Sequence, residues 1–188
     1  MYKKTCLLIF VLSFSSQLSA QTLAVSRWRA GAAYAFLLGE LRNHFHYPRN
    51  YSVEGEAFLK KDPEEASPWS LPFSLSFMQL YSDDVRASYV SQAFSLRSGL
   101  AYRFQHESWL ASRLSLGLSA SVWKLSARDH QIQMTASQTY TVGLYTEFAE
   151  EFGWNQKWGS SFFLRSQYPE VGVYSLIFEL GFGLIYVI

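Results

Sequence analysis

Cysteine and charge are both scarce in this sequence of 188 residues. The single cysteine, Cys6, lies within a stretch that we expect to be removed, so the remaining chain has no disulfide, thiolate ligand or cysteine nucleophile. Charged residues make up 16% of the chain, and the net charge is +1. Because a nucleic-acid partner requires a clustered basic face, we expect none.

Long hydrophobic runs are also missing after residue 20. A transmembrane helix needs about 20 consecutive apolar residues, and no such run occurs. Yet 49% of the residues are hydrophobic and 18% are aromatic. The apolar residues must therefore be spread along the chain by alternation.

The N-terminus has the three parts of a secretory signal peptide. Lys3 and Lys4 are basic, residues 6–14 (CLLIFVLSF) are apolar, and residues 15–20 (SSQLSA) are small and polar. The apolar part is too short for a transmembrane helix. We therefore predict a signal peptide over residues 1–20, cleavage before Gln21, and one mature domain over residues 21–188.

Alternation with a period of two recurs along the mature chain and predicts β-strands. From Trp28 to Leu38, for example, the even positions are mostly apolar, and the odd positions include Arg29 and Gly31. Eight segments are predicted as strands: 28–38, 51–59, 71–81, 94–104, 110–122, 140–148, 158–168 and 174–188. Several are long enough for tilted transmembrane strands, which need about 9–11 residues.

Polar and turn-forming residues separate these segments and predict the connections. The predicted connections are 44–50, 60–68, 83–84, 105–108, 124–137, 150–156 and 169–172. The connection over residues 124–137 is the longest. We therefore predict an all-β, eight-stranded, antiparallel up-and-down barrel.

The composition of the two strand faces predicts which face points inward. One face carries Leu, Phe and Tyr, whereas the other carries mainly Ser, Gly and Thr with a few charges. An eight-stranded barrel has a narrow interior that side chains fill, so it has no room for a face of large aromatic residues. The apolar face is therefore predicted to contact lipid, as in a transmembrane barrel. A soluble periplasmic ligand-binding barrel, with the faces reversed, is the alternative.

Charged residues on the small-residue face are predicted to form a network inside the barrel, where unpaired charges would be costly. This predicted network comprises Arg29, Glu54, Glu56, Arg97, Arg103, Arg113, Glu147, Arg165 and Glu179. We interpret these ions mainly as packing material, because an eight-stranded barrel leaves little room for a channel.

Aromatic residues near the strand ends are predicted to form two girdles at the membrane interfaces. One girdle is expected to include Trp28, Trp109, Trp158 and Tyr186. The other is expected to include Tyr81, Trp123, Tyr140 and Tyr174.

The last predicted strand alternates to the end of the chain, with Leu184, Tyr186 and Ile188 on one face. It resembles the C-terminal strand signal of outer-membrane barrels, which usually ends in Phe. At the level of architecture, residues 21–188 resemble the small OmpA/OmpX-type barrels. This resemblance implies periplasmic termini, insertion by the barrel assembly machinery and location in the bacterial outer membrane.

Histidines in the predicted outer connections are the candidates for catalysis. His44 and His46 lie in the first of these connections, and Asp129 and His130 lie in the longest. Some small outer-membrane barrels modify lipid A with rim His and Ser residues, and Ser126 and Ser137 are available here. No spacing matches a catalytic or metal motif, so we predict no enzyme activity, cofactor or metal.

The sequence thus favours a non-enzymatic barrel that is structural, adhesive or a subunit of a larger envelope assembly. The expected partners are outer-membrane lipid or lipopolysaccharide and, for a subunit, other envelope proteins. A lipid A-modifying enzyme with rim histidines and the soluble periplasmic barrel are the alternatives.

Overall fold

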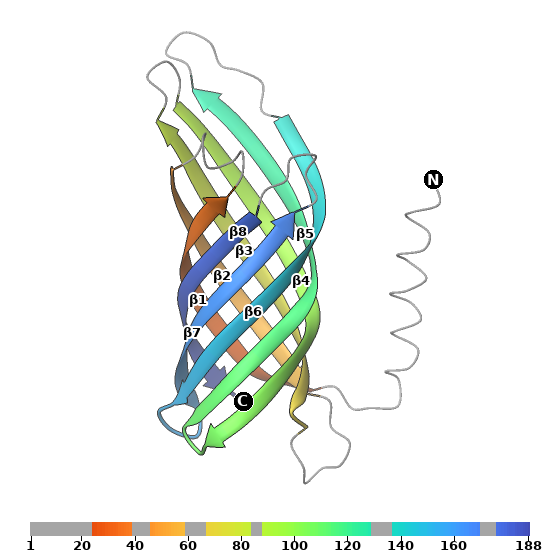
Figure 1. Cartoon of the computed structure of the whole chain (residues 1–188), viewed down its shortest axis with the longest axis vertical. Coiled ribbons are helices and arrows are strands. Elements are labelled where there is room, and N and C mark those ends of the chain that lie inside the picture. Colours follow the sequence, from red (N-terminus) through yellow and green to blue (C-terminus); the bar gives the residue numbers. More distant parts are fainter. Residues whose placement is uncertain (1–23, 39–45, 59–66, 84–87, 129–136, 170–175) are drawn as a thin grey trace, which may run out of the picture.

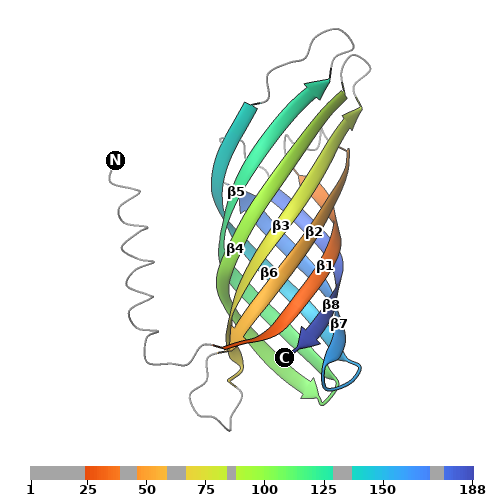
Figure 2. The same cartoon turned by 180° about the vertical axis from the view of Figure 1, so that it is seen from behind.

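The computed structural model describes residues 24–38, 46–58, 67–83, 88–128, 137–169 and 176–188, which form a closed barrel (Figures 1 and 2). All eight neighbouring strand pairs are antiparallel, and β1 closes the barrel by pairing with β8. The strands are β1 (Ala24–Leu38), β2 (His46–Phe58), β3 (Trp69–Asp83), β4 (Ser88–Glu107), β5 (Leu110–Arg128), β6 (Ser137–Gly153), β7 (Trp158–Pro169) and β8 (Leu176–Val187). Within the described ranges, no helix is long and apolar enough to cross a membrane.

The predicted fold class is confirmed, but several predicted connections were too long. Residues 46–50 belong to β2, residues 105–107 to β4, residues 124–128 to β5 and residues 150–153 to β6. These segments are polar and were therefore predicted to be loops. Cross-strand hydrogen bonds nevertheless continue through them, because a polar strand near a barrel rim has solvent available to its side chains. The strands have 12–20 residues, more than a membrane crossing requires.

Each end of the barrel is defined by particular chain positions. The terminal rim contains the start of β1, the end of β8 and the turns at residues 108–109 and 154–157. The opposite rim contains the end of β1 at Leu38 and the end of β5 at Arg128. Since the strands run up and down, each strand has one end at the terminal rim and the other at the opposite rim (Figure 1).

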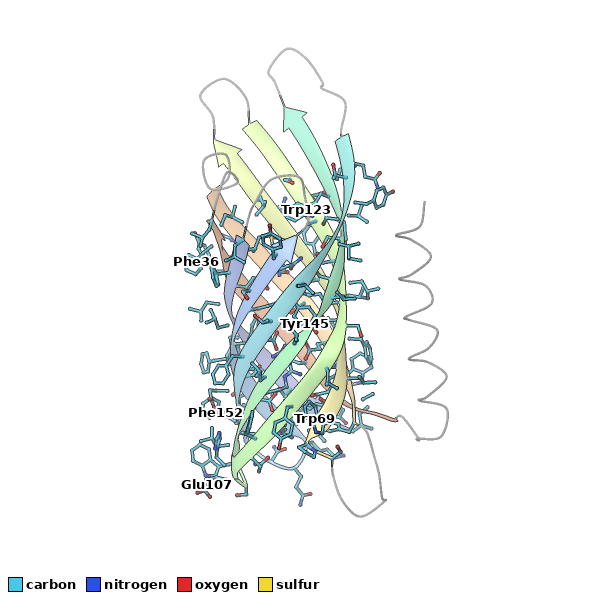
Figure 3. All side chains as sticks on the ribbon, turned by 45° about the vertical axis from the view of Figure 1, so that its right-hand side comes forward. Phe36, Trp69, Glu107, Trp123, Tyr145 and Phe152 are labelled. Atoms are coloured by element: carbon cyan, nitrogen blue, oxygen red, sulfur yellow. The ribbon has the colours of Figure 1, made fainter. Side chains whose placement is uncertain are left out.

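Large apolar side chains cover the outside of the barrel, as the strand patterns predict. Leu75 is 65% exposed, Phe94 60%, Leu116 59% and Leu144 57%. Figure 3 shows Phe36 pointing away from the barrel. Exposing such a surface to water would be costly, so it matches the hydrocarbon core of a lipid bilayer.

The inside of the barrel is polar toward the terminal rim and apolar toward the opposite rim. Ala35, Leu37, Met78, Leu80, Ala93 and Ile177 form a buried cluster within the strand ends of the opposite rim. Trp123 packs against this cluster, so it does not belong to the outward aromatic girdle in which we predicted it. The reason is its parity, because Trp123 lies on the same face of β5 as the buried Ser119 and Ser121.

Strands β4 and β5 approach very closely at one pair of glycines. Gly99 and Gly117 lie opposite each other in the register. A Cβ added to Gly99 would lie 2.2 Å from the carbonyl oxygen of Leu116, and one on Gly117 would lie 2.2 Å from that of Ser98. Only glycine fits at these two paired positions, because the atoms that a Cβ would meet belong to the backbone.

Candidate functional site: the lumenal ion cluster and the rims

Eleven charged side chains converge inside the barrel and are linked by ion pairs; we call this set the lumenal ion cluster. It comprises Arg27, Arg29, Arg97, Arg103, Arg113, Arg165, Glu54, Glu56, Glu147, Glu151 and Glu179. All of them except Arg103 are less than one-tenth exposed. The cluster therefore fills the lumen rather than lining an open channel.

Glu147 of β6 occupies the centre of the cluster. Its Oε1 atom accepts hydrogen bonds from the Nη2 atoms of Arg29 and Arg113, both at 2.5 Å. Its Oε2 atom accepts from Arg165, with a distance of 2.8 Å to Nε. One carboxylate thus joins guanidinium groups from β1, β5 and β7, which ties distant parts of the wall together.

The glutamates on β2 and β6 complete the half of the cluster next to the terminal rim. Glu54 lies 2.6 Å from Arg113 and 2.9 Å from Arg29. Glu151 lies 2.5 Å from Arg27 and 3.1 Å from Arg103. Each of these buried carboxylates has at least two cationic partners, which offsets the cost of removing it from water.

Phe163 places an aromatic ring between two of the arginines. The guanidinium carbons of Arg29 and Arg165 lie 4.8 and 4.9 Å from the ring centroid. Phe163 is 2% exposed and extends inward from β7. Cation–π attraction therefore adds to the ion pairs in holding these arginines.

Arg97 is the least compensated member of the cluster. Its closest carboxylate contact is 3.5 Å, from Nη1 to Glu179 Oε2. That carboxylate already accepts hydrogen bonds from Arg165 at 2.7 Å and from Asn50 at 2.6 Å. Among the described residues, none of the Arg97 guanidinium nitrogens has a hydrogen-bond partner, although the side chain is 1% exposed.

This contrast predicts opposite effects for two arginine substitutions. Arg97→Met removes a poorly paired buried charge, so the free energy of unfolding should stay the same or rise by about 1 kcal/mol. Arg165→Met removes a partner of Glu147 and Glu179 and should lower it by about 3 kcal/mol. Urea unfolding of the barrel in lipid vesicles measures both, and equal losses for the two variants would contradict the ranking.

Sequence reasoning missed Arg27, Glu151, Asn50 and Phe163. Arg27 continues the alternation of Arg29, and Glu151 continues that of Glu147. The first predicted strand began at Trp28, one residue after Arg27, and the sixth ended at Phe148, three residues before Glu151. Longer strands would have included both. Phe163 shares the inward face of Arg165, two residues further on, so the alternation does place it inside. It was missed because large aromatic side chains are expected on the outer face of a narrow barrel.

The predicted aromatic residues of the terminal rim gather there and face outward. Trp28, Trp109 and Trp158 are between 39% and 54% exposed. The rings of Trp158 and Tyr186 lie 4.9 Å apart between centroids. Of the other predicted girdle, Tyr140 is 73% exposed. Tyr174 and the side chain of Tyr81 lie outside the described residues.

The histidines that we considered for catalysis are not brought together in the described residues. His44, Asp129 and His130 lie outside them, and His46 begins β2 without a described side chain. Within the described part of the chain, no group of three His, Cys, Asp or Glu residues could hold a metal ion.

A different histidine makes a specific contact at the terminal rim. His106 Nε2 lies 2.6 Å from Ser112 Oγ, and Ser112 donates a hydrogen bond of 2.8 Å to Glu150. A hydroxyl has one proton, so in this arrangement His106 donates to Ser112. A nucleophilic serine requires the opposite, with histidine accepting the proton and a third group orienting the histidine. These hydrogen bonds therefore link β4, β5 and β6 at the rim and have the geometry of a structural contact.

An antiparallel eight-stranded barrel with charged residues packed inside and an apolar exterior has the fold of the small outer-membrane β-barrels. Solved structures of such proteins match this chain. The Neisserial surface protein NspA matches with a TM-score of 0.59 and 16% identity, covering 89% of this chain and 100% of NspA. A major outer membrane protein from Thermus thermophilus matches with a TM-score of 0.60 and 11% identity, covering 88% of this chain and 100% of that protein.

Ail, the attachment invasion locus protein of Yersinia pestis, is also similar, with a TM-score of 0.54 and 12% identity. That match covers 85% of this chain and 96% of Ail. No protein-family model and no curated protein matches the sequence. At these identities the shared feature is the fold.

Proposed function

We propose that this chain is a non-enzymatic integral protein of the bacterial outer membrane. Its proposed role is structural or adhesive, or that of a subunit in a larger envelope assembly. The observation that carries the proposal is the distribution of polarity: the ions are buried in the lumen, and large apolar side chains are exposed on the wall. Water would favour the reverse distribution, whereas a lipid bilayer favours this one.

The filled lumen supports a structural role over transport. Arg113 and Glu147 are each 1% exposed at the centre of the cluster. Toward the opposite rim, Leu80 and Ile177 are fully buried in the apolar cluster. These two buried layers of different chemistry occupy successive parts of the lumen, which favours a packed barrel over a water-filled pore.

The proposed partners follow from the same location. The exposed wall would contact outer-membrane lipid or lipopolysaccharide, and the barrel assembly machinery would insert the chain. Other envelope proteins would be partners in the subunit role. The periplasmic termini implied by the family resemblance would place the terminal rim on the periplasmic side.

Cell fractionation tests the proposed location. When the full chain is expressed in a Gram-negative host, we expect it in the outer-membrane fraction. We also expect it to migrate differently before and after boiling, because a closed barrel resists detergent until heated. A freely soluble periplasmic protein would contradict the proposal. Purification in mild detergent then distinguishes the two remaining roles. A subunit should co-purify with another envelope protein, whereas a free structural or adhesive barrel should purify as a monomer.

A further inference from the structure

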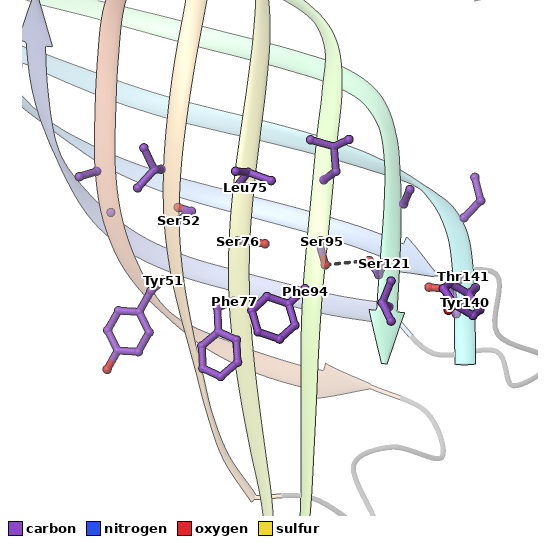
Figure 4. A pocket seen from close by; sticks show the side chains of 17 residues that line it. Tyr51, Ser52, Leu75, Ser76, Phe77, Phe94, Ser95, Ser121, Tyr140 and Thr141 are labelled. Carbon is purple, nitrogen blue, oxygen red and sulfur yellow. Dashed lines mark hydrogen bonds between the residues drawn. The ribbon is translucent and has the colours of Figure 1, made fainter. Parts of the chain in front are cut away.

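An apolar groove of about 900 Å³ crosses the outer surface of strands β1 to β6 (Figure 4). One wall is a row of outward side chains that are registered neighbours, and we call it the aromatic row. It contains Tyr51, Phe77, Phe94, Val122 and Tyr140. The second wall includes the neighbouring row of Val53, Leu75, Leu96 and Val142. Between the two walls lie inward-facing residues such as Ser76 and Ser95, which present little side chain to the outside.

A polar row borders the aromatic row on the side of the opposite rim. On each strand it lies two residues closer to the opposite rim than the aromatic row. It consists of Arg49, Gln79, Gln92, Lys124 and Gln138, which are again registered neighbours. Arg49, Lys124 and Gln138 are exposed. Gln138 donates a hydrogen bond of 3.0 Å to the Tyr140 hydroxyl, which joins the polar row to the aromatic row.

The boundary between these two rows has the character of a membrane interface. Tyrosine and other aromatic rings favour the headgroup level, and long cationic side chains reach phosphates there. The polar row contains two cations and three amides and no carboxylate. Its charge is therefore complementary to an anionic headgroup, while the groove beside it is complementary to an acyl chain.

The spacing of the two cations indicates how the anionic groups are arranged. Arg49 on β2 and Lys124 on β5 are separated by three strand spacings, which is about 14 Å at 4.8 Å per strand. Separate phosphates can therefore occupy the two ends of this span. Two phosphates on one rigid headgroup would match it, with the amides between them available for hydroxyl groups.

We propose that the groove and the polar row form a binding site for one diphosphorylated, multi-acyl glycolipid of lipid A type. The acyl chain lies in the groove, and Arg49 and Lys124 each bind a phosphate. This site rests on the proposed function, because the opposite rim faces the outer leaflet only if the termini are periplasmic.

Native mass spectrometry of the detergent-purified full chain, titrated with lipid A, tests the site. The double variant Arg49→Gln/Lys124→Gln should bind lipid A about tenfold more weakly, because it loses two partly exposed ion pairs with phosphate. Lys157→Gln is the matched control, because Lys157 is an exposed cation in the turn of the terminal rim. It should bind lipid A like the unaltered chain.

Two further ligands make the result specific. Enzymatically dephosphorylated lipid A should bind the unaltered chain about tenfold more weakly than lipid A does. The unaltered chain and the double variant should bind this dephosphorylated lipid with equal affinity. Phosphatidylglycerol, with one phosphate, should also bind more weakly than lipid A. Equal lipid A binding by the double variant and the unaltered chain would overturn the site, as would equal affinity for phosphatidylglycerol.

The failure of this site is distinguishable from failure of the proposed function. A double variant that keeps its outer-membrane location and its heat-dependent mobility, but binds lipid A normally, overturns only the site. A chain that fractionates as a soluble protein overturns the proposed location itself.

Discussion

Replacing Glu147 with glutamine is expected to lower the free energy of unfolding by about 3–5 kcal/mol. The carboxylate is 1% exposed and binds Arg29, Arg113 and Arg165 at once. Glutamine has nearly the same shape but no charge, so three buried guanidinium groups would lose their shared counter-ion. Equilibrium urea unfolding in lipid vesicles, followed by tryptophan fluorescence, measures the loss.

Glu107→Gln is the control for this substitution. Glu107 is an exposed glutamate at the end of β4, so its replacement should change stability by less than about 0.5 kcal/mol. A loss below about 1 kcal/mol for Glu147→Gln would show that the cluster does not depend on its central carboxylate.

Replacing Gly99 with alanine is expected to cost about 3 kcal/mol or to prevent closure of the barrel. The added Cβ would lie 2.2 Å from the carbonyl oxygen of Leu116 and 2.7 Å from the Cα of Gly117. Both are backbone atoms, so β4 and β5 would have to move apart and lose register. The fraction of refolded protein that keeps heat-dependent mobility measures closure, and urea unfolding measures stability.

Gly153→Ala is the matched control within the same barrel. A Cβ at Gly153 would lie 3.7 Å from its nearest heavy atom, the Cα of Trp109, which is an ordinary contact. Its stability should stay the same or rise slightly, because alanine restricts the unfolded chain. Equal effects at the two positions would refute the explanation by close approach of β4 and β5.

The sequence predicted the eight-stranded barrel and the facing of most strands, because alternation is a local property. Leu75 and Leu116 are exposed on the wall, whereas Arg97 and Arg113 are buried in the lumen. It predicted strand ends less well, since β5 continues through polar residues to Arg128. Polarity near a rim marks access to solvent, and it does not mark where hydrogen bonding between strands stops.

By itself, the sequence determined that this chain alternates apolar and small or charged residues over eight segments, and therefore which face meets lipid. The tertiary structure alone decided which residues meet within the lumen and along the wall. The partners of Glu147 come from positions 29, 113 and 165, and the polar row joins Arg49 to Lys124 across three strand spacings. These groupings depend on the register and closure of the barrel, which place distant residues together and which no local pattern encodes.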